Sequence, residues 1–123
     1  MLLRCLKMFE LIKKIERVII ICGRTDMRCG IDRLSAIIRF HYGLDPLEAG
    51  SLFLFCGRKT DRIKGLIYNG TGFCLVYIRL TDGKFQWPRN SDEARDISPE
   101  QYRRFMDGFA IDSSIKKISR IEP

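Results

Sequence analysis

The sequence predicts a single α+β domain, in which an antiparallel β-meander of hairpins packs with two main helices. Short apolar runs bounded by turn residues fill the middle of the chain, and an amphipathic helical pattern lies on either side of them. The length of 123 residues suits one domain, and 46% apolar residues can supply its core. We expect an N-terminal extension over 1–15 that can form a helix, the domain over 16–109, and a mobile basic tail over 110–123.

The first predicted strand spans 18–22, where an unbroken β-branched apolar run indicates burial on both faces. Its place in the sheet does not follow from the sequence. Thr25 or Asp26 is then expected to cap a helix over 27–42. That helix has an apolar stripe made of Ile31, Leu34, Ile37, Ile38 and Tyr42.

A run of hairpins is predicted over residues 51–87, with about four antiparallel strands. The first strand covers 51–56, and alternation in the next puts Arg62 and Lys64 on one face. Asn69 and Gly70 open the sequence N-G-T-G, a strong hairpin signal because these residues tolerate positive φ. A further turn, T-D-G-K, leads into F-Q-W-P as the fourth strand.

The polar stretch 89–97 is predicted to be a loop, and a helix follows over 98–109. Ser98 is its expected cap, Pro99 takes the first turn, and Gln101 completes a capping box. The buried stripe of this helix is expected to consist of Tyr102, Phe105, Met106 and Phe109.

Composition narrows the function classes. Lys and Arg number 22 against 15 acidic residues, a net charge of +7 that favours a polyanion such as nucleic acid. The five cysteines have no C-x-x-C spacing and there is one histidine, so we predict no metal site, no cofactor and a reducing cytosol. No signal peptide or membrane span is expected.

Two buried strands end in nearly the same turn, C-G-R-T-D-M-R at 22–28 and C-G-R-K-T-D-R at 56–62. If both strands end at the same side of the sheet, their arginines form one basic edge. If the strands run in opposite directions, the similarity of the two turns is a coincidence. The residues with expected structural roles in turns are Gly23, Asp26, Gly57, Asp61, Asn69 and Gly70. The candidate nucleic-acid contacts are Arg24, Arg28, Arg58, Lys59, Arg62, Lys64, Arg79, Lys84 and Trp87.

Other interpretations of these residues stay open. The basic side chains are also what an ordinary solvated face of a sheet would carry. Asp26, Asp32 and Asp61 would serve a metal-dependent nuclease if they gathered at one edge, although each has a simpler role as a cap, a solvated side chain or an ion-pair partner. A phosphate-binding P-loop is rejected, because G-R-K-T lacks the required spacing.

Several ordered motifs resemble one known family. They are V-I-I-I-C-G-R-T-D-M-R-C-G-I-D-R-L, then G-L-D-P at 43–46, L-F-L-F-C-G-R-K-T-D-R-I-K-G-L-I-Y, G-T-G-F-C-L-V-Y-I-R-L and G-K-F-Q-W-P. Together they are similar to the TnpB-type accessory proteins of the "IS sixty-six" group of bacterial insertion sequences, over about residues 16–109. These proteins are encoded beside the transposase.

This resemblance implies a role in transposition of the element and no established catalytic residues. We therefore predict a non-enzymatic accessory protein that binds DNA, either the element ends or the target, through the basic edge and hairpins. The main alternative is an adaptor that docks on the transposase or another protein of the element. A metal-dependent nuclease is the third and least supported possibility.

Overall fold

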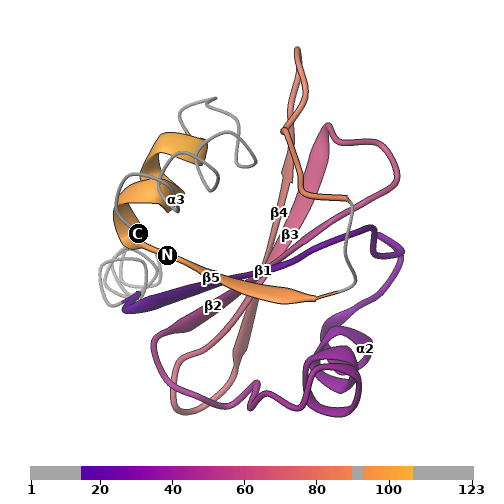
Figure 1. The fold of residues 1–123 in the computed structure, drawn as a ribbon. Coiled ribbons are helices and arrows are strands. Elements are labelled where there is room, and N and C mark those ends of the chain that lie inside the picture. The colour runs from indigo at the N-terminus through magenta and orange to yellow at the C-terminus, as the bar shows by residue number, and fades with distance from the viewer. Residues whose placement is uncertain (1–14, 90–92, 107–123) are drawn as a thin grey trace, which may run out of the picture.

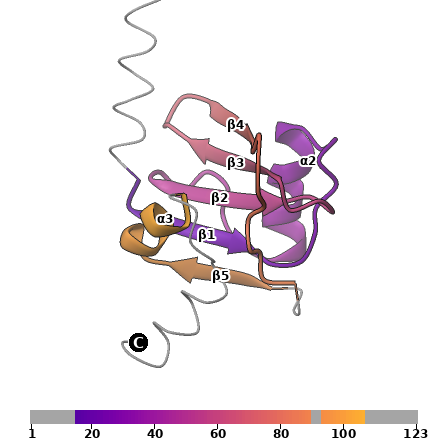
Figure 2. The same ribbon diagram turned by 90° about the horizontal axis from the view of Figure 1, so that it is seen from above.

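A computed structural model describes residues 15–89 and 93–106, apart from the side chain of Phe105. One mixed sheet has the strand order β4-β3-β2-β1-β5, with β4 and β5 at its edges (Figure 2). The strands are β1 (Arg17–Ile21), β2 (Ser51–Cys56), β3 (Arg62–Tyr68), β4 (Phe73–Arg79) and β5 (Ala94–Ile97). The helices are α2 (Ile31–Ala36), which continues as the π-helix η1 (Ile37–His41), and α3 (Pro99–Met106). The predicted α+β class is confirmed.

The sheet separates two hydrophobic cores, with α2 and α3 on opposite sides of it (Figure 1). Successive residues of β1 alternate between the cores, so Val18 and Ile20 face one while Ile19 and Ile21 face the other. All four are at most 2% exposed. The unbroken apolar run in the sequence follows from this burial on both faces.

The position of β1, which the sequence left open, is beside β2 and parallel to it. Ile19 lies opposite Phe53 in this register, and β1 pairs antiparallel with β5 on its other side. Parallel neighbours require a crossover, and α2 with η1 lies in that connection. The sheet is therefore mixed, with antiparallel pairing confirmed from β2 to β4.

The predicted hairpin between β3 and β4 is confirmed, although its two turn residues act differently. Gly70 has the positive φ of 99° that the turn needs, whereas Asn69 does not have positive φ. Instead, the Asn69 side-chain oxygen accepts hydrogen bonds from the backbone N–H groups of Thr71 and Gly72, at 2.9 and 2.8 Å.

The predicted fourth meander strand, which was to contain F-Q-W-P, is wrong. Residues 81–88 form no strand and run across the other strands toward β5 (Figure 2). Phe85 and Trp87 are buried in the same core as α3, and the Trp87 indole N–H donates to the Ile21 carbonyl at 2.9 Å. Burial of these two large side chains holds the segment over the face of the sheet.

The first helix begins later than predicted, at Ile31, and neither Thr25 nor Asp26 caps it. The Asp26 carboxylate instead accepts a hydrogen bond from the Arg28 backbone N–H at 2.9 Å, which closes a turn before the helix. Gly30 occupies the N-cap position with an extended backbone. Gly43 follows the end of η1 with a φ of 66°, a conformation that favours glycine after a helix.

The polar stretch before the last helix contains a strand, β5, so its prediction as a loop is wrong for 94–97. Arg17 of the neighbouring strand forms an ion pair with Asp96 there, with Nε and Oδ1 2.6 Å apart.

The capping box of α3 is confirmed, because Ser98 and Gln101 exchange hydrogen bonds. Tyr102 and Met106 pack on the core as expected. Phe109, the segment 1–14 and the tail 110–123 lie outside the described residues, as does the Phe105 side chain.

Candidate nucleic-acid interface

The two C-G-R turns lie side by side at one edge of the sheet. Because β1 and β2 are parallel and neighbours, both strands end at the same edge, which meets the condition set by the sequence. The Thr25 backbone N–H, in the first turn, donates to the Cys56 carbonyl at the end of the second strand, at 2.8 Å. The two similar turns in the sequence are therefore neighbours in the structure.

Arg89 joins the two turns. Its guanidinium donates from Nη1 to the Gly23 carbonyl at 3.0 Å and from Nη2 to the carbonyls of Gly57 and Arg58. Its neighbour Pro88 accepts a hydrogen bond from the Gly23 N–H at 2.8 Å. Sequence reasoning missed Arg89, which stands in a polar stretch with no local pattern that distinguishes it from a solvated arginine.

The glycines of the two turns serve different purposes. Gly23 has a φ of 80°, which favours glycine, as the sequence suggested. Gly57 does not have positive φ. A Cβ on Gly57 would lie 2.5 Å from Cγ of Met27, so this position needs glycine for close packing between the two turns.

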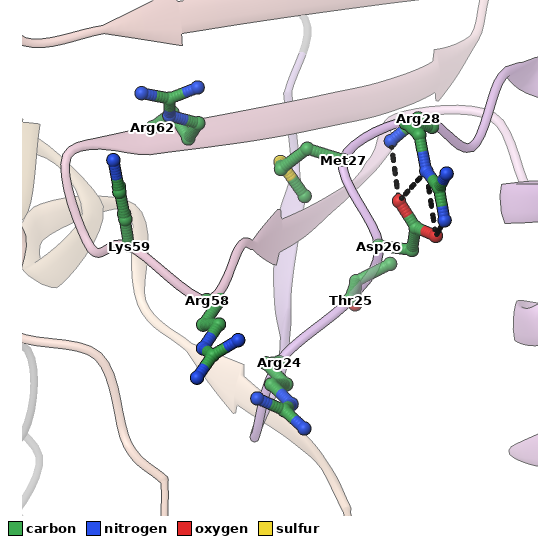
Figure 3. Close-up of a pocket in the computed structure, with 8 residues that line it drawn as sticks. All are labelled: Arg24, Thr25, Asp26, Met27, Arg28, Arg58, Lys59 and Arg62. Carbon is green, nitrogen blue, oxygen red and sulfur yellow. Dashed lines mark hydrogen bonds and ion pairs between the residues drawn. The ribbon is translucent and has the colours of Figure 1, made fainter.

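Between the turns lies an open hollow of about 620 Å³. We call it the basic hollow, and its lining residues are Arg24, Thr25, Asp26, Met27, Arg28, Arg58, Lys59 and Arg62 (Figure 3). Five of these side chains are cations and one is a carboxylate. The hollow therefore presents a positive surface to which five of the nine predicted contact residues contribute.

Three of the cations have no ion-pair partner within the described residues. In the ranges 15–89 and 93–106, the side chains of Arg24, Arg58 and Lys59 form no hydrogen bond or ion pair. All three residues are exposed. Figure 3 shows Arg24 and Arg58 extending from the ends of their strands in the same direction. Such side chains can neutralise an anion without first breaking an internal contact.

The other two cations of the hollow are paired with neighbouring carboxylates. Arg28 forms an ion pair with Asp26, in which Nη2 and Oδ2 are 2.8 Å apart. Hydrogen bonds from Arg28 lower the pKa of Asp26 to about 2. Arg62 holds Asp61 at 3.0 Å and likewise lowers the pKa of that carboxyl. With both carboxylates in ion pairs, the metal-nuclease interpretation loses its support. Across the described part of the chain, no group of three or more His, Cys, Asp or Glu side chains gathers to hold a metal ion.

Two of the remaining predicted contacts, Lys64 and Arg79, extend the basic hollow along the β3–β4 hairpin. Arg62 lies opposite Arg79 and Lys64 opposite Tyr77, so these four side chains share one face of the sheet. This confirms that Arg62 and Lys64 lie on the same face. Lys84 lies in the exposed loop after β4, next to Phe85, whose backbone N–H donates to the Thr60 carbonyl of the second turn.

Trp87 was predicted as a nucleic-acid contact, and its position is incompatible with that role. It is 3% exposed and belongs to the core beside α3, where its N–H is bonded to β1. The sequence showed an aromatic residue near basic ones, but it did not show that the segment folds back over the sheet. A buried ring cannot offer its face to a base.

Comparison with known proteins shows which proteins the chain is similar to. The family model described as "IS66 Orf2 like protein" matches residues 16–116. The chain is 40% identical over 92 residues to the "Uncharacterized protein y4hO" of Sinorhizobium fredii, covering 75% of this chain and 79% of that protein. It is 29% identical over 92 residues to "Uncharacterized protein y4jC" of the same organism, covering 75% and 78% respectively. No solved structure matches the chain significantly.

None of the helices in the described ranges is long and apolar enough to cross a membrane.

Proposed function

This chain belongs to the IS66 Orf2-like family of insertion-sequence proteins, and from that membership we propose that it assists transposition by binding DNA through the basic hollow. The family is one of accessory proteins that accompany a transposase. The proposed contribution is non-catalytic: the chain holds the DNA backbone in the bacterial cytoplasm while the transposase carries out strand transfer.

The observation that carries this proposal is the convergence of cations at one sheet edge. Arg24 and Arg58 come from turns more than 30 residues apart, yet parallel pairing of β1 and β2 makes them line one hollow. Arginine suits phosphate because its planar fork can donate two parallel hydrogen bonds. An open hollow lined by such groups fits a backbone, which runs past the site, better than a small enclosed ligand.

Fluorescence anisotropy across a salt series tests the proposal. One duplex carries the terminal inverted repeat of the element, and the other carries a scrambled sequence of equal length. We expect binding whose logarithm falls linearly with the logarithm of salt concentration. The double variant Arg24→Gln/Arg58→Gln should bind more weakly, with a slope reduced by about 0.9 for each phosphate that the protein no longer neutralises.

The matched control removes the same charge elsewhere. Arg39 on η1 and Arg103 on α3 are exposed and do not line the basic hollow, so Arg39→Gln/Arg103→Gln should retain the wild-type slope. If both double variants weaken binding equally, the loss of affinity depends only on net charge. That result would contradict the assignment of the basic hollow as the binding surface. Preference for the inverted repeat would indicate recognition of the element ends, and equal binding would indicate an architectural role.

A specific observation also favours the adaptor function. Phe40 on η1 is 81% exposed, more than the other large apolar side chains of the described residues. It lies in a π-helix, a conformation that often occurs at functional sites. Docking of this side chain on the transposase predicts that Phe40→Ser abolishes co-purification of the two proteins after nuclease treatment. Unchanged co-purification would remove Phe40 from that interface.

A further inference from the structure

A second element of recognition lies next to the basic hollow, around Tyr77 of β4. This side chain is 49% exposed in the middle of a strand, at a position where most of its neighbours are half-buried. Its cross-strand partner is Lys64, and Arg62 and Arg79 form the adjacent pair on the same face. An exposed aromatic residue therefore lies beside three cations.

A cation lies over one face of the Tyr77 ring. The Lys64 ammonium donates to the Cys29 carbonyl at 2.8 Å, and it lies 5.8 Å from the centre of the Tyr77 ring. This anchored cation covers one face of the ring, within the range of a cation–π contact. About half of the residue stays exposed, which leaves surface for contact with a second planar group.

The ring also borders the basic hollow. Arg62, which lines the hollow, has a raised pKa, chiefly through Asp61 and to a smaller extent through the nearby Tyr77 hydroxyl. Lys64 is bonded to Cys29, the residue after Arg28 of the hollow. One strand of nucleic acid lying along this edge would meet both cations and an aromatic ring.

We propose that Tyr77 is a base-stacking residue and that the ligand of this surface is single-stranded DNA, with phosphates in the basic hollow and a base on the ring. This inference rests on the proposed DNA-binding function and specifies its substrate. Bases inside a duplex already stack on both faces, so they cannot use an exposed tyrosine. A base in a single strand has free faces and stacks on aromatic side chains whatever its sequence.

Anisotropy with two fluorescein-labelled probes tests the inference: a thymidine homopolymer of about 20 nucleotides, longer than typical single-strand sites, and a duplex of equal length. Tyr77→Leu should weaken binding to the single strand by roughly 5- to 150-fold, as expected when one base no longer stacks. Binding to the duplex should change by less than about twofold, because its phosphate contacts remain.

Two further variants make the result specific. Tyr77→Trp keeps an aromatic face and should bind the single strand at least as well as the wild type. Leu47→Ala removes an exposed apolar side chain from the connection between η1 and β2, outside the lining of the basic hollow, and should leave both affinities unchanged. Thermal unfolding of each variant confirms that it is folded before binding is compared.

The outcomes separate this inference from the proposed function. If Tyr77→Leu binds the single strand normally, or binds both probes more weakly by the same factor, the stacking role is wrong while duplex binding through the hollow still stands. If the wild-type chain binds neither probe at low salt, the DNA-binding function fails and the stacking role fails with it.

Discussion

Gly23 and Gly57, which lie in the turns after two parallel strands, are joined through one side chain that donates a hydrogen bond to each of their carbonyls. That side chain is Arg89, which reaches the sheet edge from the segment after β4. Because these carbonyls lie beyond the last ladder partners of β1 and β2, the guanidinium supplies donors that no strand supplies. Arg89 thereby fixes the spacing of the turns that carry Arg24 and Arg58.

Replacement of Arg89 should therefore affect both stability and binding. We expect Arg89→Ala to lower the free energy of unfolding by about 1–2 kcal/mol, since it removes hydrogen bonds from a charged donor at a partly exposed site. DNA affinity should fall as well, because the two turns lose their common support. Urea denaturation and anisotropy measure the two effects.

The control for this variant is Arg103→Ala, which removes an exposed arginine from α3. It should leave stability within about 0.5 kcal/mol of the wild type, as is usual for surface substitutions. Arg89→Lys should rescue only part of the effect, because an ammonium lacks the planar fork that spans two carbonyls. A fully stable, fully binding Arg89→Ala protein would show that the turns hold their positions without it.

Close packing of Met27 on Gly57 leads to a second prediction. Gly57→Ala should destabilise the protein by about 1–3 kcal/mol, the usual cost of overpacking, because its Cβ would meet Met27 at 2.5 Å. Met27→Ala makes room, so the double variant should be more stable than the sum of the single effects implies, by more than about 0.5 kcal/mol. Thermal or urea unfolding of the four proteins measures this coupling.

Gly72→Ala is the matched control, because a Cβ there would meet no atom within 4 Å. Its stability should change by less than about 0.5 kcal/mol. Strictly additive effects of Gly57→Ala and Met27→Ala would mean that the two turns adjust independently, contrary to the packing described.

The ion pair between Asp26 and Arg28 predicts a dependence on pH. Hydrogen bonds from Arg28 lower the pKa of Asp26 to about 2, so the folded state favours the charged carboxylate. The stabilisation is present above the unfolded-state pKa of about 3.9 and is lost as the pH falls from about 4 to about 2. NMR titration of the side-chain carboxyl should give a midpoint near 2 in the wild type.

In Arg28→Gln the same midpoint should move upward toward the ordinary aspartate value, because the main cause of the shift is gone. Asp26→Asn should remove this contribution to acid sensitivity, while the pair of Asp61 with Arg62 stays in place. A wild-type midpoint close to 4 would show that the ion pair does not persist in solution.

Local patterns predicted several elements well. Strands β2 to β4, the hairpin at Gly70 and the capping box of Ser98 with Gln101 depend on nearby residues, so the sequence reveals them directly. The failures have tertiary causes. Strand β5 is polar and forms beside β1, where Arg17 satisfies Asp96. The segment with Trp87 is shaped by burial against β1 rather than by strand pairing.

By itself, the sequence determined the α+β class, the family resemblance and the presence of two similar arginine-rich turns, because each is a matter of local order along the chain. Only the tertiary structure decided that β1 and β2 are parallel neighbours, which brings both turns to one edge. It also decided which aromatic residue is exposed: Tyr77 is exposed beside cations, whereas Trp87 is buried in the core. Burial and strand pairing join residues that are distant in sequence, and no local pattern contains that information.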